Sequence, residues 1–262
     1  MFIARVGLEG ERAAFAVIEG VSAKGVPAAD AEAVILKSHP FGELEPTGER
    51  VPLTDVRLLP PILPTKIIGI GKNYADHVKE MGGDTPPAEP IVFFKPSTAL
   101  TGTGDAIKLP WQSDHVEHEV ELAVVMGRRA RNVTREEALD YVFGYTVAND
   151  VSARDIQKKD GQWGRAKGFD TFLPMGPWIA TSINPNELVL RTLVNDDVRQ
   201  DGNTRDLIHD VATLISFCSE FMTLLPGDII LTGTPAGVSP IVEGDVVQCV
   251  IEGIGEIINT VE

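Results

Sequence analysis

The chain has 262 residues, which is long enough for one large domain or two unequal ones with a substantial hydrophobic core. Its composition, 43% hydrophobic and 23% charged, is ordinary for a globular protein, and no apolar run approaches the ~20 residues of a membrane-spanning helix. The net charge of −15 argues against nucleic acids and anionic membranes as partners, because the field of the chain repels phosphate. An anionic ligand would need positive side chains gathered locally.

Two further features of the sequence bear on the compartment. Arg5 and Glu9 interrupt the N-terminus too early for a secretory signal. Cys218 and Cys249 lie far apart and form no C-x-x-C motif, so we expect buried, reduced thiols. We therefore expect a cytoplasmic protein.

The first part of the chain reads as β structure without an evident catalytic constellation. Glycine, proline and acidic turns separate its short apolar runs. The expected strands are residues 1–6, 13–18 and 34–36. Pro60, Pro61 and Pro64 then punctuate the chain, which predicts a boundary between a small N-terminal β domain, 1–60, and a larger domain, 61–262.

The larger domain begins with a strand at 67–70 and a short helix at 74–81, which Gly82 and Gly83 end. His77 and Glu80 are three residues apart and share one face of this helix. A carboxylate beside an imidazole fixes its tautomer and raises its basicity, which makes the pair a candidate general base for water. The alternative is a surface salt bridge on a polar helix.

The next apolar strand, in residues 91–100, turns at Lys95 and Pro96. Lys95 at such a strand end either binds the anionic substrate or points into solvent. The sequence leaves both interpretations open.

An acidic strand follows at residues 116–126, where apolar and acidic side chains alternate. With a period of two, Glu117, Glu119 and Glu121 lie on one face. Glutamate is a poor strand former and adjacent like charges repel, so a bound cation is the simplest compensation for this arrangement.

A second, apolar strand at 142–148 places Asp150 at its end, where side chains converge on a site. Ser152 and Asp155 have the spacing of a capping box that opens a short helix. An all-carboxylate ligand set suits Mg²⁺ or Mn²⁺ rather than zinc. The alternative is that the glutamates line a solvated sheet face and Asp150 caps a turn.

Positive side chains then follow the acidic strand. Arg154, Gln157 and Lys158 lie on adjoining positions of one helix face. The long loop at 160–178 is rich in glycine, proline and aromatic residues, which favours a functional role over a plain connection. Lys167 in this loop can present a charge to a substrate or enolate oxygen.

The last third of the chain is predicted to be mainly structural. A hairpin joins residues 188–194 to the segment around Val198, and the apolar spacing over residues 207–225 predicts the strongest helix in the chain. After a strand at 229–231, the small residues around Thr234 either seat a substrate carboxylate or only form a Gly/Pro turn. Terminal strands are expected at 246–251 and 256–261.

Five blocks of this sequence, in order, together resemble the fumarylacetoacetate hydrolase superfamily. They are G-K-N-Y-A-D-H-V-K-E, F-F-K-P-S-T-A, E-H-E-V-E-L-A-V-V-M-G, A-N-D-V-S-A-R-D-I-Q and M-T-L-L-P-G-D-I-I-L-T-G-T-P-A-G. The resemblance spans about residues 64–262. It implies a mixed, β-rich α+β fold, with a β-roll catalytic domain beside the small N-terminal β domain, and commonly a homodimer.

The resemblance also implies roles for the residues singled out above. Glu119, Glu121 and Asp150 would hold the divalent metal. Lys167 and Gln157 would contact substrate oxygens, and His77 with Glu80 would activate water. Arg154 is similar to the family's arginine one turn beyond the metal aspartate, and is assigned to substrate binding together with Lys95 and Thr234.

The implied chemistry is C–C bond cleavage in a small anionic 2-oxo acid through a metal-bound enolate. Three outcomes share that enolate: hydrolysis of an acylpyruvate or fumarylpyruvate-like acid, decarboxylation of oxaloacetate, and isomerisation of 2-hydroxyhepta-2,4-diene-1,7-dioate in aromatic catabolism. His77 and Glu80 favour activated water, so hydrolysis leads. A non-catalytic metal-binding scaffold is the competing hypothesis, but such a site would not require Lys167, Arg154 and a His/Glu pair.

Overall fold

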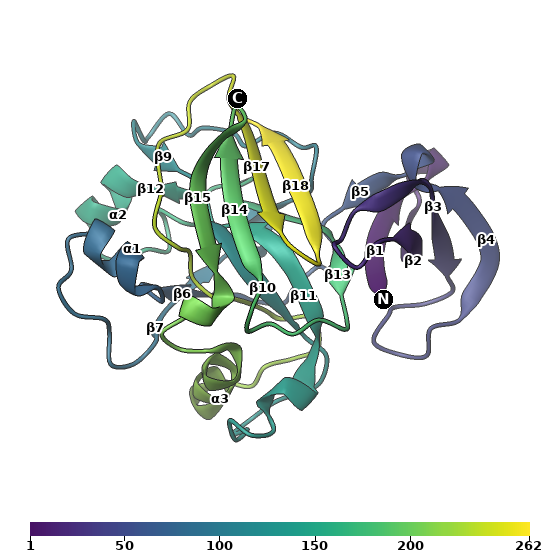
Figure 1. The fold of residues 1–262 in the computed structure, drawn as a ribbon, viewed down its shortest axis with the longest axis horizontal. Helices are drawn as coiled ribbons and strands as arrows, with labels where there is room; N and C mark the ends of the chain where they lie inside the picture. The colour runs from purple at the N-terminus through teal and green to yellow at the C-terminus, as the bar shows by residue number, and fades with distance from the viewer.

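The computed structural model describes residues 1–262, apart from the side chain of Glu11, and it is the β-rich α+β fold with few helices that the sequence predicts (Figure 1). The strands are β1 Phe2–Gly7, β2 Ala13–Val21, β3 Pro27–Leu36, β4 Pro46–Pro52, β5 Arg57–Leu59, β6 Ile67–Gly71, β7 Ile91–Lys95, β8 Leu100–Thr101, β9 Val116–Glu117, β10 Val120–Met126, β11 Val142–Asn149, β12 Ser152–Ala153, β13 Leu173–Ala180, β14 Val189–Val194, β15 Asp197–Asn203, β16 Ile229–Leu231, β17 Val246–Ile251 and β18 Gly255–Thr260. The α-helices are α1 Ala75–Glu80, α2 Arg154–Asp160 and α3 Val211–Phe221, and the 3₁₀ turns are η1 Glu9–Glu11, η2 Leu53–Asp55, η3 Ser97–Ala99, η4 Ala138–Tyr141 and η5 Thr204–Asp206.

A 12-stranded sheet forms the frame of the molecule, with the strand order β4-β3-β2-β1-β13-β11-β10-β16-β6-β7, while β5 pairs with β1 and β8 with β13. A second sheet, β15-β14-β17-β18, packs over β10, β11 and β13 (Figure 1). The side chains between the two sheets form the largest hydrophobic core. The helices lie at the edges of this sandwich, so the site is built mainly from strand ends and loops.

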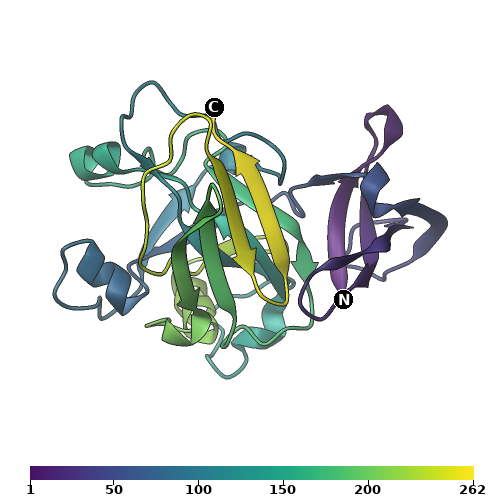
Figure 2. The ribbon, with the colours of Figure 1, turned by 45° about the horizontal axis from the view of Figure 1, so that its top comes forward.

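The N-terminal strands β1–β5 form a lobe beside the main body (Figure 2). Strand β1 joins the large sheet because Phe2 pairs with Ala180 and Ile3 with Ile179 in β13. The lobe has its own small core, into which Trp178 of β13 packs. The predicted strands are present: β1 has the expected length, shifted by one residue, and β2 and β3 are longer than expected. The boundary near residue 60 stays a prediction.

The acidic segment is buried on both faces, which contradicts the alternative of a solvated sheet face. Every residue from 116 to 126 is buried, and Glu121 is 1% exposed. The predicted single strand is also broken: β9 ends at Glu117 and β10 begins at Val120. The break frees Glu119 from strict alternation and lets its side chain meet that of Asp150.

Two predicted helix starts are wrong. Ser152 does not cap a helix, because β12 pairs with β9 and the Ser152 hydroxyl donates to the carbonyl of Asp150. Helix α3 begins at Val211, not at 207, because the Asp210 carboxylate accepts the backbone N–H of Thr213 and fixes the N-terminus there. Among the described residues, no helix combines the length and apolar character needed to cross a membrane.

Candidate active site

Three carboxylates converge where β10 and β11 run side by side. In the antiparallel register, Glu121 pairs with Ala148, and Val120 with Asn149, so Glu119 and Asp150 meet at the end of the pair. The Asp150 N–H donates to the Glu119 carbonyl at 2.8 Å. One oxygen from each of Glu119, Glu121 and Asp150 lies within 4.8 Å of the other two. Backbone pairing therefore produces the convergence that the sequence predicts.

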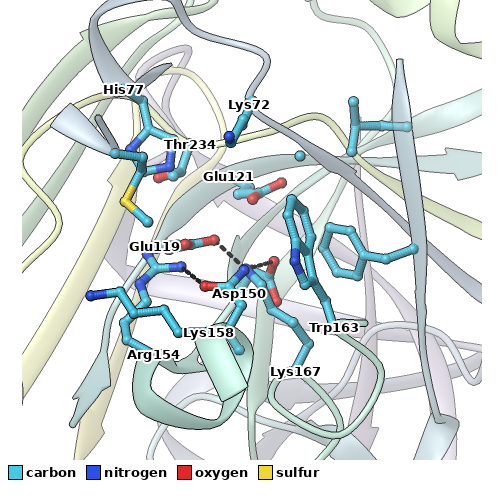
Figure 3. A pocket seen from close by; sticks show the side chains of 15 residues that line it. Lys72, His77, Glu119, Glu121, Asp150, Arg154, Lys158, Trp163, Lys167 and Thr234 are labelled. Atoms are coloured by element: carbon cyan, nitrogen blue, oxygen red, sulfur yellow. Dashed lines mark hydrogen bonds and ion pairs between the residues drawn. The ribbon is translucent and has the colours of Figure 1, made fainter. Parts of the chain in front are cut away.

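Basic side chains neutralise two of these acids. The Lys167 ammonium lies 2.6 Å from both Glu119 Oε2 and Asp150 Oδ2 (Figure 3). Lys95 Nζ lies 2.5 Å from Asp150 Oδ1. Arg154 donates to Glu119 and, at 2.6 Å, to Glu117 Oε2. Glu117, which the sequence left unassigned, thus holds Arg154 in place and is not one of the three convergent acids.

The pKa values of the two glutamates move in opposite directions. Burial raises the pKa of Glu119, but Arg154 and Lys167 outweigh it and hold that pKa well below its usual range. Burial, followed by repulsion from Asp150 and Glu119, raises the pKa of Glu121 well above its usual range. Glu121 receives only the backbone N–H of Gly233, at 2.6 Å. Its charge is the uncompensated one in the cluster.

This imbalance fits a divalent cation. Three carboxylates offer the hard oxygen donors that Mg²⁺ and Mn²⁺ prefer, and a cation between them would remove the repulsion at Glu121. The donor set does not favour zinc, since neither thiolate nor imidazole belongs to it. Glu119, Glu121 and Asp150 are therefore the residues that would hold such a metal.

The carboxylates lie in a cavity of about 230 Å³. Its lining contains most of the residues that the sequence singled out. Those residues are His77, Glu119, Glu121, Asp150, Arg154, Gln157, Lys158, Lys167 and Thr234 (Figure 3). Arg154 Nη1 donates to Gln157 Oε1 at 2.9 Å, so the two neighbours predicted on one face of α2 are in contact.

The histidine and its carboxylate partner are arranged as the spacing predicts. His77 Nδ1 lies 2.9 Å from Glu80 Oε2, and Glu80 Oε1 accepts the Gly237 N–H at 2.9 Å. Because an ionised carboxylate accepts hydrogen bonds, this contact assigns the ring proton to Nδ1 and leaves Nε2 as the basic nitrogen. Glu80 stands behind His77 and does not itself line the cavity.

Lys95 is not in the predicted place. Its ammonium is fully buried behind Asp150 and is absent from the cavity lining among the described side chains. Burial lowers the pKa of Lys95 despite the attraction of Asp150. Lys95 therefore holds Asp150 in position, and the structure does not bring it to a substrate.

Thr234 lines the cavity, but its hydroxyl is already engaged. It donates to the Val120 carbonyl at 2.9 Å and accepts from Gln200 Nε2 at 2.7 Å. In this arrangement Thr234 presents only a lone pair of its hydroxyl oxygen to the cavity. It can therefore accept a hydrogen bond from a ligand, but it cannot donate one to a ligand carboxylate. Gln200, missed in the sequence, is fully buried in β15, and its side chain fixes the Thr234 loop from the second sheet.

An aromatic wall, also missed, closes another side of the cavity. Trp163 and Phe93 meet with ring centroids 5.4 Å apart, and Lys167 Nζ lies 5.1 Å from the centroid of the Phe93 ring. A Cβ at Gly71 would come within 2.2 Å of the Trp163 ring. Any larger residue at this position would push the Trp163 ring away from β6.

Known protein families and individual proteins match this chain over most of its length. The model of the fumarylacetoacetate (FAA) hydrolase C-terminal family matches residues 66–262, and the Rv2993c-like N-terminal family matches residues 1–61. Protein Rv2993c of Mycobacterium tuberculosis is 54% identical over 86% of this chain and 86% of its own length.

Two similar proteins carry names that state a reaction. The mitochondrial oxaloacetate tautomerase fahd2 of Xenopus laevis is 45% identical over 79% of this chain and 69% of its own length. A crystal structure of 5-carboxymethyl-2-hydroxymuconate delta-isomerase from Mycobacterium smegmatis superposes with a TM-score of 0.92, at 49% identity, covering 100% of this chain and 99% of that one.

Proposed function

Because the chain belongs to the fumarylacetoacetate hydrolase family, we propose that it catalyses proton transfer beside the oxo group of a small 2-oxo acid, interconverting its keto and enol forms. One observation supports this proposal above all: the three buried carboxylates, Lys167 and His77 line the same cavity. The cavity thus combines a place for a cation, a fixed ammonium and a base. Enolisation needs these three elements and no further one.

The cation would supply the electrostatic part of the chemistry. Held by Glu119, Glu121 and Asp150, Mg²⁺ or Mn²⁺ would accept the 2-oxo carboxylate and lower the energy of negative charge on the enolate oxygen. Lys167 adds a second positive charge beside the same oxygens. Its pKa is raised because Asp150 and Glu119 outweigh the effect of burial, so the ammonium stays protonated.

His77 carries the proton. Glu80 accepts the Nδ1 proton in a hydrogen bond, so Nε2 removes a proton from the carbon next to the oxo group and delivers it to the enolate oxygen, which gives the enol. The same two transfers in reverse give the keto form. Arg154 and Gln157 orient the substrate from α2, and their mutual hydrogen bond fixes both side chains. Lys95 holds Asp150 in place, and Gln200 holds Thr234 in place.

Tautomerisation leads over the other outcomes because it forms the shared enolate by proton transfer alone and needs neither a C–C bond cleavage nor an attacking water. The names of two similar proteins, an oxaloacetate tautomerase and a delta-isomerase, describe proton transfers of this kind. Hydrolysis of an acylpyruvate is the second candidate. It is favoured by the His77–Glu80 pair, which is as suitable for activating water as for moving a proton.

The test follows oxaloacetate and an acylpyruvate with Mg²⁺ or Mn²⁺ present. We expect the enol absorbance of oxaloacetate to relax faster than in buffer, without formation of pyruvate. His77→Ala should lower the rate about 10²–10⁴-fold, the usual contribution of general acid–base catalysis. Lys79→Ala is the matched control, since Lys79 lies on the same helix but is exposed.

Other products would change the assignment. Accumulation of pyruvate would make the protein a decarboxylase, and cleavage of the acylpyruvate into two acids would make it a hydrolase. A cation that raises the melting temperature while every substrate remains unchanged would favour the non-catalytic scaffold.

A further inference from the structure

Two lysines in the cavity have no partner for their charge. Arg154 and Lys167, the other arginine and lysine side chains of the lining, are engaged with the buried acids. Within the described structure, neither Lys72 nor Lys158 forms an ion pair, although both line the cavity. In a chain with a net charge of −15, unpaired ammonium groups inside a cavity are the local positive charge that an anionic ligand needs.

Lys72 also has an unusual backbone. Its φ of 56° lies in the left-handed region, where a lysine is disfavoured by roughly 1–2 kcal/mol and glycine or asparagine fits better. Backbone outliers of this kind cluster at binding and active sites, where the surrounding structure maintains them. The conformation is therefore a reason to look for a function of this side chain.

The neighbours of Lys72 hold it rigidly. On one side, Gly71 lies against the Trp163 ring with no room for a Cβ. On the other, Asn73 Nδ2 donates to the Thr232 carbonyl at 2.8 Å, and Asn73 Oδ1 accepts the His209 N–H at 2.8 Å. A charge held on a fixed backbone binds its partner at a lower entropy cost than a freely moving one.

Figure 3 shows Lys72 and Lys167 on opposite sides of Glu121, with Lys167 beside Asp150. A 2-oxo carboxylate bound at the three acids would face Lys167 with its reacting end. Its far end would extend towards the Lys72 side. We propose that Lys72 binds a second, distal carboxylate, so that the substrate is a dicarboxylic 2-oxo acid; this inference rests on the function proposed above.

Lys158 is a weaker candidate for the same role. It is exposed on the last turn of α2, where solvent and salt screen its charge. We therefore assign the discrimination between substrates to Lys72 and only a small contribution to Lys158.

The test compares oxaloacetate with its 4-methyl ester, which keeps the reacting end and removes the distal charge. In Lys72→Asn the left-handed backbone remains favourable while the charge is lost. We expect KM for oxaloacetate to rise about 10- to 100-fold, the loss of one charge-assisted hydrogen bond, with kcat nearly unchanged. KM for the ester should stay constant. Lys72→Arg should retain most of the preference for oxaloacetate over the ester, because it keeps the positive charge.

Lys159→Gln is the control, because Lys159 adjoins Lys158 on α2 but is exposed and does not line the cavity. Its KM values should match those of the wild type, and Lys158→Gln should raise KM for oxaloacetate less than threefold. The inference is overturned if Lys72→Asn changes KM for both substrates equally, or for neither.

Binding separates this inference from the function on which it rests. If neither substrate is turned over, the proposed function fails, yet calorimetry with Mg²⁺ still compares oxaloacetate with pyruvate, which lacks the distal carboxylate. We expect tighter binding of oxaloacetate in the wild type and a loss of that advantage in Lys72→Asn. Equal affinity for the two acids in the wild type would refute the role of Lys72 independently of catalysis.

Discussion

Ion pairs occur in two regions of the molecule with opposite surroundings. On the N-terminal lobe, Arg50 bridges Glu19 and Glu32 with its side chain 45% exposed. In the candidate active site, Lys167 bridges Glu119 and Asp150 with its side chain 4% exposed. The residue types and contacts are alike, and the effective dielectric constant differs. Burial, not the number of ion pairs, decides how much each pair affects stability and chemistry.

The largest effect is expected from breaking the buried bridge. Lys167→Met leaves Glu119 and Asp150 without their shared cation, so the free energy of unfolding in EDTA should fall by about 3–5 kcal/mol. The turnover rate should fall about 10²–10³-fold, because charge on the enolate loses a fixed stabiliser. Urea denaturation and steady-state kinetics measure the two effects.

The same loop supplies a control for this substitution. Arg165 pairs with Asp160 at the surface, so Arg165→Met should change stability and turnover little. If Lys167→Met in EDTA has the same free energy of unfolding as the wild type, the buried bridge is not important for stability.

Within the site, two of the convergent acids should respond oppositely to neutralisation. Asp150→Asn removes the negative charge that pairs with Lys95 and one of the two that pair with Lys167. The free energy of unfolding of the metal-free protein should therefore fall by about 3 kcal/mol. Glu121→Gln relieves repulsion from Asp150 and Glu119 and should raise metal-free stability at pH 7. Both variants should lose the ~2.7 kcal/mol that a cation at 100 times its Kd adds to the wild type. Thermal melts with EDTA and with Mg²⁺ separate these outcomes.

The raised pKa of Glu121 also sets the sign of a pH dependence. The folded protein binds its proton more tightly than the unfolded chain, so the metal-free protein loses stability as pH rises above the ordinary glutamate pKa. Glu121→Gln should abolish this part of the slope. Urea midpoints between pH 5 and pH 8 measure it, and an unchanged slope in the variant would assign the dependence to another group.

The local features of the site were predictable from sequence, because short-range spacing determines them. The acidic segment supplied both Glu119 and Glu121, and the end of an apolar strand placed Asp150, although the break between β9 and β10 was not predicted. Spacing along a helix predicted the contact of His77 with Glu80. These arguments need only the periods of strand and helix.

The remaining features depend on contacts between distant segments. Lys95 meets Asp150 across 55 positions, through a sheet whose strand order does not follow the chain. Gln200 reaches Thr234 from the other sheet, and its position in a hairpin gave no signal of that role. The Ser152 spacing resembled a cap, but pairing of β12 with β9 kept the segment extended. Tertiary pairing overrode the local pattern in each case.

The smallest effect is expected at the exposed bridge that Arg50 forms on the N-terminal lobe. Arg50→Gln removes contacts with Glu19 and Glu32, yet solvent already screens these charges. The free energy of unfolding should change by less than about 1 kcal/mol, and the difference should disappear in high salt. A urea titration at low and at high ionic strength measures both values. A loss as large as that of Lys167→Met would mean that the lobe depends on Arg50 for its packing, since charge alone cannot account for it at such exposure.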